Sequence, residues 1–358
     1  MTNMIPLSSI CISDLERKYV NEALDNNIIS SSGKHVKRFE DLISYRTDNK
    51  YAIATSSGTS SLELLLRAMD IGINDEVIVP AFTFASPALA VVSLGAKPIF
   101  VDISLNTWTI DPFEVAKKIN SRTKAIIAVD ILGHPCDYDE LKKFGVPIIE
   151  DAAEAHGARY KGHPVGSLGN AAIFSFHANK VISSGEGGCI VTNDFNLAQT
   201  IRNLNSFGMD PQKPYWHIQC GSNRKMSNLV AAFGVGQLER WDELIAARKE
   251  VAEQYDKAFK SLPIQRRPVA EWAEESVWLY TLATEKRSSI LNACFKLGID
   301  ARAVWTLLPE NPIFKEYSSE DYPIAKKISS TAIWLPTWSL MPQNYIDKVV
   351  SVVKNIFD

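Results

Sequence analysis

The sequence lacks the features that mark several large classes of protein. No apolar run approaches the roughly 18 residues needed to span a bilayer, and Met1–Ser9 lacks the basic start and apolar core of a signal peptide. The five cysteines are scattered with no close pair, which favours reduced thiols over a disulfide framework or a zinc site. With a net charge of -3, the chain lacks the excess of positive charge that is typical of nucleic-acid-binding proteins. We therefore expect a cytoplasmic protein that binds no metal, membrane or nucleic acid.

The composition that is present is that of an ordinary globular protein, with 46% hydrophobic and 22% charged residues. A chain of 358 residues is too long for one ordinary core, so we expect one large and one small domain. Asp242–Phe259 has the pattern of a long amphipathic helix that links them. We therefore assign residues 1–240 to the large domain and residues 241–358 to the small C-terminal domain.

Short apolar runs alternate with helical segments along the first half of the chain. Such alternation predicts an α/β domain with a mostly parallel sheet. In sheets of this kind, ligands bind at the carboxyl ends of the strands. The expected strands are 52–54, 76–80, 97–102, 123–130, 146–151 and 171–176.

Lys180 lies between two apolar runs of strand length, 171–176 and 188–192. Three glycines, Gly185, Gly187 and Gly188, follow it on the same connection. Lysine is rarely buried unless it is paired or chemically used. The position therefore indicates a functional lysine, with a solvated hairpin lysine as the alternative.

A turn of small polar residues, Ser57, Gly58 and Thr59, joins the first expected strand to a helix. Such a turn offers free backbone N–H groups, a hydroxyl and the positive end of the helix dipole, which together suit a phosphate group. Capping of the helix alone is the alternative function. Ser60 and Glu63 fit the spacing of a capping box.

Acidic and aromatic residues follow other expected strands. Asp151 comes directly after an apolar strand, where an acid needs a cationic partner or caps a following helix. Glu154 and His156 lie close behind it in the sequence. Phe82 and Phe84 follow the strand 76–80, where an aromatic side chain packs either in the core or against a ligand.

One cofactor would use all of these groups. A pyridoxal phosphate enzyme needs a lysine that bonds to the cofactor, a carboxylate for the ring nitrogen, a phosphate cradle and an aromatic side chain over the ring. The Gly58–Thr59 turn, Phe84, Asp151 and Lys180 supply these groups in that order along the chain.

The combined motifs resemble the DegT/DnrJ/EryC1/StrS sugar aminotransferase family over almost the whole chain. The resemblance implies a fold type I aminotransferase, with a central, mostly parallel seven-stranded sheet and a smaller C-terminal α/β domain, that works as a homodimer with shared active sites. The matching motifs are Ser57–Thr59, Pro80–Phe84, Glu150–Gly157, Phe174–Phe176, Asn179–Lys180, Gly185–Gly188, Gly221–Asn228 and Ala231–Gly234.

The resemblance also implies a role for each matching residue. Lys180 would hold pyridoxal phosphate and move protons, Asp151 would pair with the ring nitrogen, and Phe84 would stack on the ring. The further contacts implied are Glu154 near the phenolic oxygen, Ser57, Gly58, Thr59 and Ser175 at the phosphate, and Asn223 of the partner subunit at the same phosphate.

The implied reaction moves the amino group of L-glutamate to C4 of a nucleotide-linked 4-keto-6-deoxy sugar and leaves 2-oxoglutarate. Within the family, the chain is most similar to enzymes that act on GDP-linked 4-keto-6-deoxymannose for surface polysaccharide (O-antigen) synthesis. UDP- and dTDP-linked sugars are the alternatives, because Arg224–Lys225 and the segment after Arg302 depart from the pattern of many relatives. The candidate substrate contacts are Glu186, His217, Lys225 and Trp305, and a polar surface histidine is the alternative for His217.

Two functions of other classes compete with transamination. A branch of the family removes the sugar 3-hydroxyl as a dehydratase, but it carries histidine where Lys180 stands, so Lys180 argues against it. Regulators that bind pyridoxal phosphate without catalysis carry an added DNA-binding domain. This chain has neither spare residues nor a basic patch for such a domain.

Overall fold

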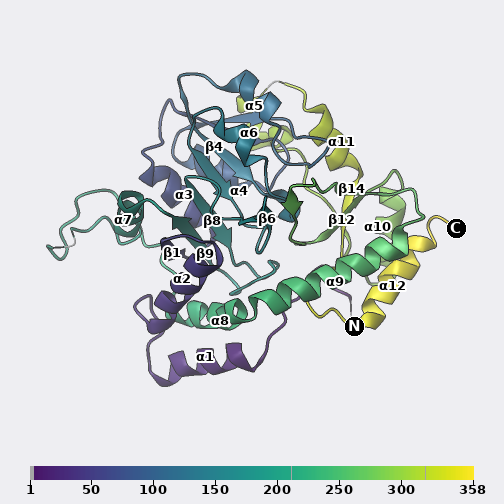
Figure 1. Cartoon of the computed structure of the whole chain (residues 1–358), viewed down its shortest axis with the longest axis horizontal. Coiled ribbons are helices and arrows are strands. Elements are labelled where there is room, and N and C mark those ends of the chain that lie inside the picture. The colour runs from purple at the N-terminus through teal and green to yellow at the C-terminus, as the bar shows by residue number, and fades with distance from the viewer. Residues whose placement is uncertain (1–3, 211, 319) are drawn as a thin grey trace.

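The largest sheet lies at the centre of the molecule. The computed structural model describes residues 4–210, 212–318 and 320–358, and Figure 1 shows helices around this sheet. In the order β8, β5, β4, β2 and β3, successive strands pair in parallel, whereas β9 runs antiparallel to both of its neighbours, β1 and β8. The expected α/β fold with a mostly parallel seven-stranded sheet is therefore confirmed. In spatial order the strands are β1 (Tyr51–Thr55), β9 (Gly188–Thr192), β8 (Ala171–Ser175), β5 (Ile148–Asp151), β4 (Thr123–Val129), β2 (Glu76–Pro80) and β3 (Lys97–Val101).

Both faces of this sheet are buried under helices. In β4, Ile127 packs in one hydrophobic cluster, and Ile126 and Ala128 pack in another on the opposite face, because successive side chains of a strand point to opposite sides. Strands buried on both faces are continuous apolar runs, which makes them recognisable in the sequence. Helices α3 (Gly58–Ala68), α4 (Ser86–Ser93) and α7 (Phe195–Leu204) belong to the first cluster, and α1 (Asp14–Asp25), α2 (Lys34–Arg46), α5 (Pro112–Lys118), α6 (Tyr138–Lys142) and α8 (Asn228–Glu239) to the second.

A smaller antiparallel sheet lies in the C-terminal part of the chain. Its strands, in spatial order, are β10 (Gln265–Arg266), β12 (Tyr280–Ala283), β14 (Ala332–Leu335) and β13 (Arg302–Ala303). Its apolar side chains form a third cluster with α10 (Arg287–Lys296) and α12 (Gln343–Lys354). The remaining elements are α11 (Pro323–Thr331), the 3-10 turns η1 (Ile131–Gly133), η2 (Leu308–Glu310) and η3 (Pro312–Tyr317), and a sheet of β11 (Ala273–Glu274), β6 (Arg159–Tyr160) and β7 (His163–Pro164).

Helix α9 (Trp241–Phe259) runs from one hydrophobic cluster into another, from the lower centre to the right of the molecule in Figure 1. Leu244 near its start packs in the cluster that contains α8, whereas Tyr255 near its end packs beside the C-terminal sheet. Ile5 forms a bridge with Ile299 and also belongs to the C-terminal cluster. The division of the chain between residues 240 and 241 stays a prediction.

Two local expectations have different outcomes. The capping box expected at Ser60 and Glu63 is wrong, because α3 already begins at Gly58 and Ser57 caps it by accepting a hydrogen bond from the Ser60 N–H at 3.1 Å. Glu63 instead pairs with Arg224. The expected strand 146–151 is confirmed but begins two residues later, at Ile148.

Throughout 4–210, 212–318 and 320–358, no helix is long and apolar enough to cross a membrane. In the same ranges, no group of three or more histidine, cysteine, aspartate or glutamate side chains is arranged to hold a metal ion. All five cysteines are free thiols.

Candidate active site

A cavity of about 320 Å³ opens where the carboxyl ends of the parallel strands meet the C-terminal part of the chain. This edge of the sheet is the usual ligand site of α/β folds. Side chains from segments far apart in the sequence converge on it. The lining includes Ser57, Gly58, Thr59, Phe84, Asp151, Glu154, Ser175, Lys180 and Glu186 from the first part of the chain, and Trp278, Arg302, Trp305 and Trp334 from the second.

Lys180 lies on the connection between β8 and β9, and its side chain is 11% exposed. Its Nζ is 3.5 Å from Glu154 Oε1 and 4.2 Å from the centroid of the Trp278 ring. A carboxylate and an aromatic face are the two kinds of group that stabilise a buried ammonium. The alternative of a solvated hairpin lysine is therefore wrong.

Asp151 ends β5 and is 5% exposed. Among the described residues it accepts one hydrogen bond, from the Ala153 N–H at 3.1 Å. Burial, with a smaller contribution from the negative charge of Glu154, raises the pKa of Asp151 to about 7. Residues 152–158 form turns, so the alternative of a helix cap is wrong. A buried carboxyl that borders a cavity and accepts a single hydrogen bond suits a ligand with a cationic N–H.

Glu154 is held from two sides. Its Oε2 accepts a hydrogen bond from the Leu132 N–H at 2.8 Å, and its Oε1 faces Lys180. Leu132 has a φ of 56°, a left-handed conformation that is costly for leucine and is concentrated at functional sites. Burial raises the pKa of Glu154, and the positive charge of Lys180 opposes that rise. The strained turn η1 thus fixes the carboxylate that faces the lysine.

The N-terminus of α3 forms a cradle of neutral donors. The Thr59 and Ser86 hydroxyls are 2.7 Å apart, and the N–H groups of the first helical turn have no acceptor inside the helix. A Cβ atom at Gly58 would lie 2.9 Å from Ser175 Cβ, so only glycine allows this close approach. The cradle has the composition of a phosphate site.

The two phenylalanines after β2 have different environments: Phe82 packs in the core, and Phe84 lines the cavity. Phe82 is fully buried and packs edge-on against Trp305, with ring centroids 5.7 Å apart. Phe84 is 56% exposed and lines the cavity, where its ring is free to contact a ligand. His156 packs among Phe174, Phe176 and Trp241, and burial lowers its pKa to about 3, so it is a neutral core residue.

The donor set fits pyridoxal phosphate, the cofactor that the resemblance implies. Asp151 can accept a hydrogen bond from a protonated ring nitrogen, Lys180 supplies a primary amine, and the cradle beside Gly58 supplies donors for a phosphate. The structure brings Lys180, Asp151, Glu154, Phe84, Ser57, Gly58, Thr59 and Ser175 together in one cavity.

The four candidate substrate contacts divide into two groups. Glu186 and Trp305 line the cavity. His217 lies on an exposed loop, with its Nδ1 atom 2.9 Å from the Phe207 carbonyl oxygen, and Lys225 lines a different cavity of about 330 Å³. Asn223 is exposed and does not line the cavity of its own chain.

Three tryptophans form an aromatic wall, of which the sequence predicted Trp305 alone, as a candidate substrate contact. Trp278 stacks on Trp305 with ring centroids 5.7 Å apart, and Trp334 packs edge-on against Trp305 at 4.7 Å. Arg302 also lines the cavity, and its guanidinium group is paired with Asp300 at 2.8 Å. These residues come from separate segments that meet through the pairing of the C-terminal strands, so no local motif marks them.

Comparison with known proteins extends these observations. The model of the DegT/DnrJ/EryC1/StrS aminotransferase family matches residues 10–354. GDP-perosamine synthase of Caulobacter vibrioides is 38% identical over 95% of each chain, and dTDP-3-amino-3,6-dideoxy-alpha-D-galactopyranose transaminase of Aneurinibacillus thermoaerophilus is 34% identical over 94% of this chain and 95% of its own. Among solved structures, Spr1654 from Streptococcus pneumoniae in its PLP form has a TM-score of 0.92 and 28% identity over 99% of this chain and 100% of its own.

Proposed function

The chain belongs to the DegT/DnrJ/EryC1/StrS aminotransferase family, and we propose that it transfers the amino group of L-glutamate to C4 of a nucleotide-linked 4-keto-6-deoxy sugar. The observation that carries the proposal is the cavity in which Lys180 faces Glu154 beside the buried Asp151 and the cradle of α3. Pyridoxal phosphate is the cofactor, and its chemistry is to take up an amino group at its aldehyde carbon and to accept electrons in its ring.

The residues of the cavity divide the work of the reaction. Lys180 anchors the cofactor covalently and, once displaced by glutamate, its Nζ removes the proton from the glutamate Cα as a general base. Asp151 holds the ring nitrogen in its protonated form, and Glu154 keeps the lysine amine directed into the cavity. Phe84 would cover the ring, and Ser57, Gly58, Thr59 and Ser175, which line the same cavity, would hold the phosphate.

Both substrates are anionic, and the cavity offers a cation for them. The Arg302 side chain is 62% exposed and lines the cavity, where its guanidinium group, already paired with Asp300, can also face a carboxylate or a diphosphate. Trp305 and Trp334 provide apolar surface beside it. A 6-deoxy sugar presents a methyl group that suits such a surface.

In its most specific form, the proposal is that the chain converts GDP-4-keto-6-deoxy-D-mannose to GDP-perosamine for O-antigen synthesis. The likeness to GDP-perosamine synthase of Caulobacter vibrioides supports this substrate. The likeness to a dTDP-sugar transaminase supports a dTDP-linked sugar as the second candidate, and UDP-linked sugars form the third.

A panel of GDP-, dTDP- and UDP-linked 4-keto-6-deoxy sugars distinguishes these candidates. With glutamate present, we expect the GDP-linked sugar to give the largest kcat/KM and a product that has exchanged a carbonyl oxygen for an amino group. Mass spectrometry of the product and assay of 2-oxoglutarate measure both. A larger kcat/KM with another nucleotide would reassign the substrate, and loss of the sugar 3-hydroxyl without 2-oxoglutarate would indicate a dehydratase.

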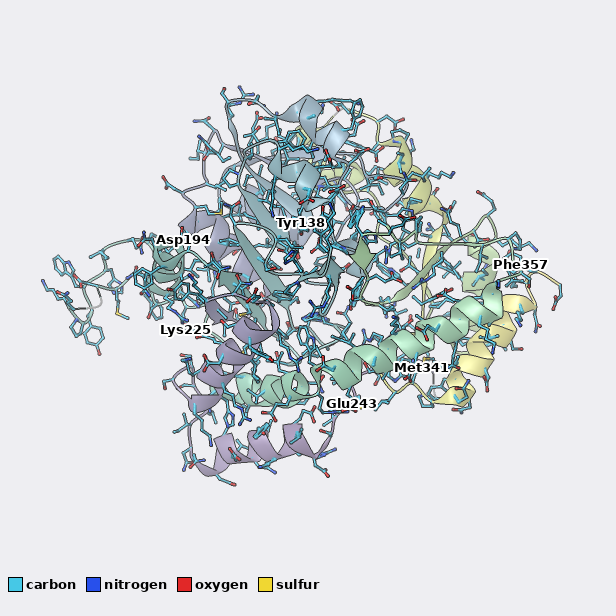
Figure 2. All side chains as sticks on the ribbon, viewed as in Figure 1. Tyr138, Asp194, Lys225, Glu243, Met341 and Phe357 are labelled. Carbon is cyan, nitrogen blue, oxygen red and sulfur yellow. The ribbon has the colours of Figure 1, made fainter. Side chains whose placement is uncertain are left out.

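We also propose that the chain works as a homodimer, because an arm of the chain stays exposed when all of the described residues are in place. The arm, residues 206–222 with 211 outside the described set, extends away from the body beyond α7 in Figure 1, and its side chains stand clear of the molecule in Figure 2. Tyr215 and Trp216 on the arm are 89% and 54% exposed. Protruding apolar surface of this kind marks a protein contact, and a second copy of the chain is the partner that the family implies.

Asn223, at the base of this arm, tests the homodimer. If Asn223 of the partner subunit completes the phosphate cradle, Asn223→Ala should weaken cofactor retention by about 1–3 kcal/mol, the cost of one hydrogen bond to a charged group. The dimer itself should remain, as gel filtration would show. Cofactor release during dialysis measures the expected loss.

Mixing Asn223→Ala with Lys180→Ala provides a stricter control. In a heterodimer, the site with the native Lys180 receives the native Asn223 from the other subunit, so subunit exchange should restore cofactor retention at that site. Retention no better than that of the Asn223→Ala homodimer would show that Asn223 does not act across the subunits.

A further inference from the structure

Arg248 is a buried cation without an ionic partner. It lies in the middle of α9 and is 2% exposed. Burial lowers its pKa to about 9, which still leaves it charged at neutral pH. In the part of the chain that the structure describes, no carboxylate pairs with it and its Nε has no hydrogen-bond partner. The other buried arginines do have such partners, since Arg240 pairs with Glu16 and Arg267 with Glu275.

An unpaired buried charge is costly, so its retention requires a physical cause. The contacts of the guanidinium group supply one. Arg248 Nη1 donates to the Trp278 carbonyl at 2.8 Å and to the Asn179 carbonyl at 3.4 Å. The Asn179 carbonyl belongs to the peptide unit whose nitrogen is that of Lys180, so Arg248 binds the backbone that carries the lysine.

The Asn179 carbonyl collects donors from several segments. Besides Arg248, it accepts hydrogen bonds from Trp278 Nε1 at 3.1 Å and from Ser8 Oγ at 3.5 Å. The indole of Trp278 in turn lies 4.2 Å from Lys180 Nζ. Arg248 therefore ties together the backbone of the lysine and the backbone of the aromatic ring against which the lysine amine rests.

We propose that Arg248 is a positioning residue for Lys180: by clamping the Asn179 and Trp278 carbonyls, it keeps the lysine amine where it captures the cofactor aldehyde. In that step, Lys180 Nζ in its neutral form adds to the aldehyde carbon, and a C=N bond replaces the C=O bond. The aldehyde oxygen leaves as water with the two amine protons. This inference rests on pyridoxal phosphate being the cofactor. A long side chain loses rotamer freedom when it is held in place, and a misplacement of about 1 Å can slow a reaction about 100-fold.

The test compares two ligands of the cofactor-free protein. Pyridoxal phosphate forms a bond to Lys180, whereas pyridoxamine phosphate has no aldehyde and binds without that bond. In Arg248→Met, we expect the rate of covalent capture to fall about 10- to 100-fold, measured by trapping with borohydride and weighing the intact protein. The affinity for pyridoxamine phosphate, measured by calorimetry, should change less than about threefold.

Three variants serve as controls. Arg248→Lys keeps a donor and should recover part of the capture rate. Trp278→Phe removes another donor to the Asn179 carbonyl and should slow capture in the same direction, which keeps the test valid if Arg248→Met does not fold. Arg240→Met removes a buried arginine between α8 and α9 that touches neither carbonyl, and it should lower the melting temperature without slowing capture.

The outcomes distinguish a clamp on the lysine backbone from general damage to the cavity. Normal capture by folded Arg248→Met, or by Trp278→Phe if that is the variant that folds, would overturn the proposal. So would an equal loss of affinity for pyridoxamine phosphate, because a damaged cavity affects both ligands. If the native protein bound neither ligand, the proposed cofactor would be wrong.

Discussion

Lys180→Ala is expected to abolish the yellow colour of the protein with pyridoxal phosphate and to lower the transamination rate by about 10⁴- to 10⁶-fold, the range for removal of a covalent catalytic group. On the proposed mechanism, the variant would lose both the covalent anchor and the base that moves the glutamate Cα proton. It should still bind pyridoxamine phosphate, because the cradle of α3 and Asp151 remain. Visible absorbance and 2-oxoglutarate formation measure the two losses.

Lys249→Ala is the matched control, since Lys249 lies on the exposed face of α9 with its side chain 64% exposed. We expect native colour and turnover from it. Covalent trapping of cofactor on Lys180→Ala, at a level equal to that of the native chain, would show that another amine carries the cofactor.

Asp151→Asn should lower kcat by about 10²- to 10³-fold, the usual effect of removing one charged group that stabilises a transition state. A neutral amide cannot hold the ring nitrogen protonated. The ring would then accept electrons less readily, which slows the chemical step. The KM for the nucleotide sugar should change little, because the loss falls on the chemical step. Steady-state kinetics with each substrate varied in turn give both quantities.

The cofactor-free form of Asp151→Asn provides an internal check through pH. Burial raises the pKa of Asp151 from 3.8 to about 7, so between these values the folded chain binds a proton that the unfolded chain has released. The contribution of Asp151 to stability is therefore complete below pH 3.8 and is lost as the pH rises through 7. At pH 8, Asp151→Asn should be more stable than the native chain, by about 4 kcal/mol at most.

Urea unfolding of both cofactor-free proteins at pH 5 and pH 8 measures this difference, which should be larger at pH 8. Asp139→Asn, a change at a half-exposed aspartate paired with Lys161, should leave turnover unchanged. If Asp151→Asn is instead less stable than the native chain at pH 8, damage to the fold would account for its low turnover.

Much of the seven-stranded sheet could be predicted, because short stretches of sequence carry the pattern that marks each strand. The strand Thr123–Val129 is buried on both faces, so it forms an unbroken apolar run, and Lys180 stands out because the runs on both sides of it are apolar. Helix α2 was not predicted, although Val36, Phe39 and Ile43 have helical spacing. Its many charged residues obscure that spacing.

Apart from Trp305, the C-terminal wall of the cavity could not be predicted, for a physical reason. Trp278, Trp305 and Trp334 meet only after β12, β14 and the segment following β13 have come together. The burial of Arg248 could not be predicted either, since a charged residue in an amphipathic helix is expected to face water. Its burial results from two carbonyl groups that lie 69 and 30 residues away in the chain.

The length of helix α9 fixes how its side chains are oriented at its two ends. Leu244 packs in one hydrophobic cluster and Tyr255 in another. Between them, Arg248 donates a hydrogen bond to the Asn179 carbonyl, next to Lys180. One added residue between these points would turn every later side chain by about 100°. The side chains of α9 could then no longer pack in both clusters while Arg248 keeps its hydrogen bonds to the two carbonyl groups. The length of α9 is therefore set by geometry, and the chain should tolerate insertions in exposed loops far better than in this helix.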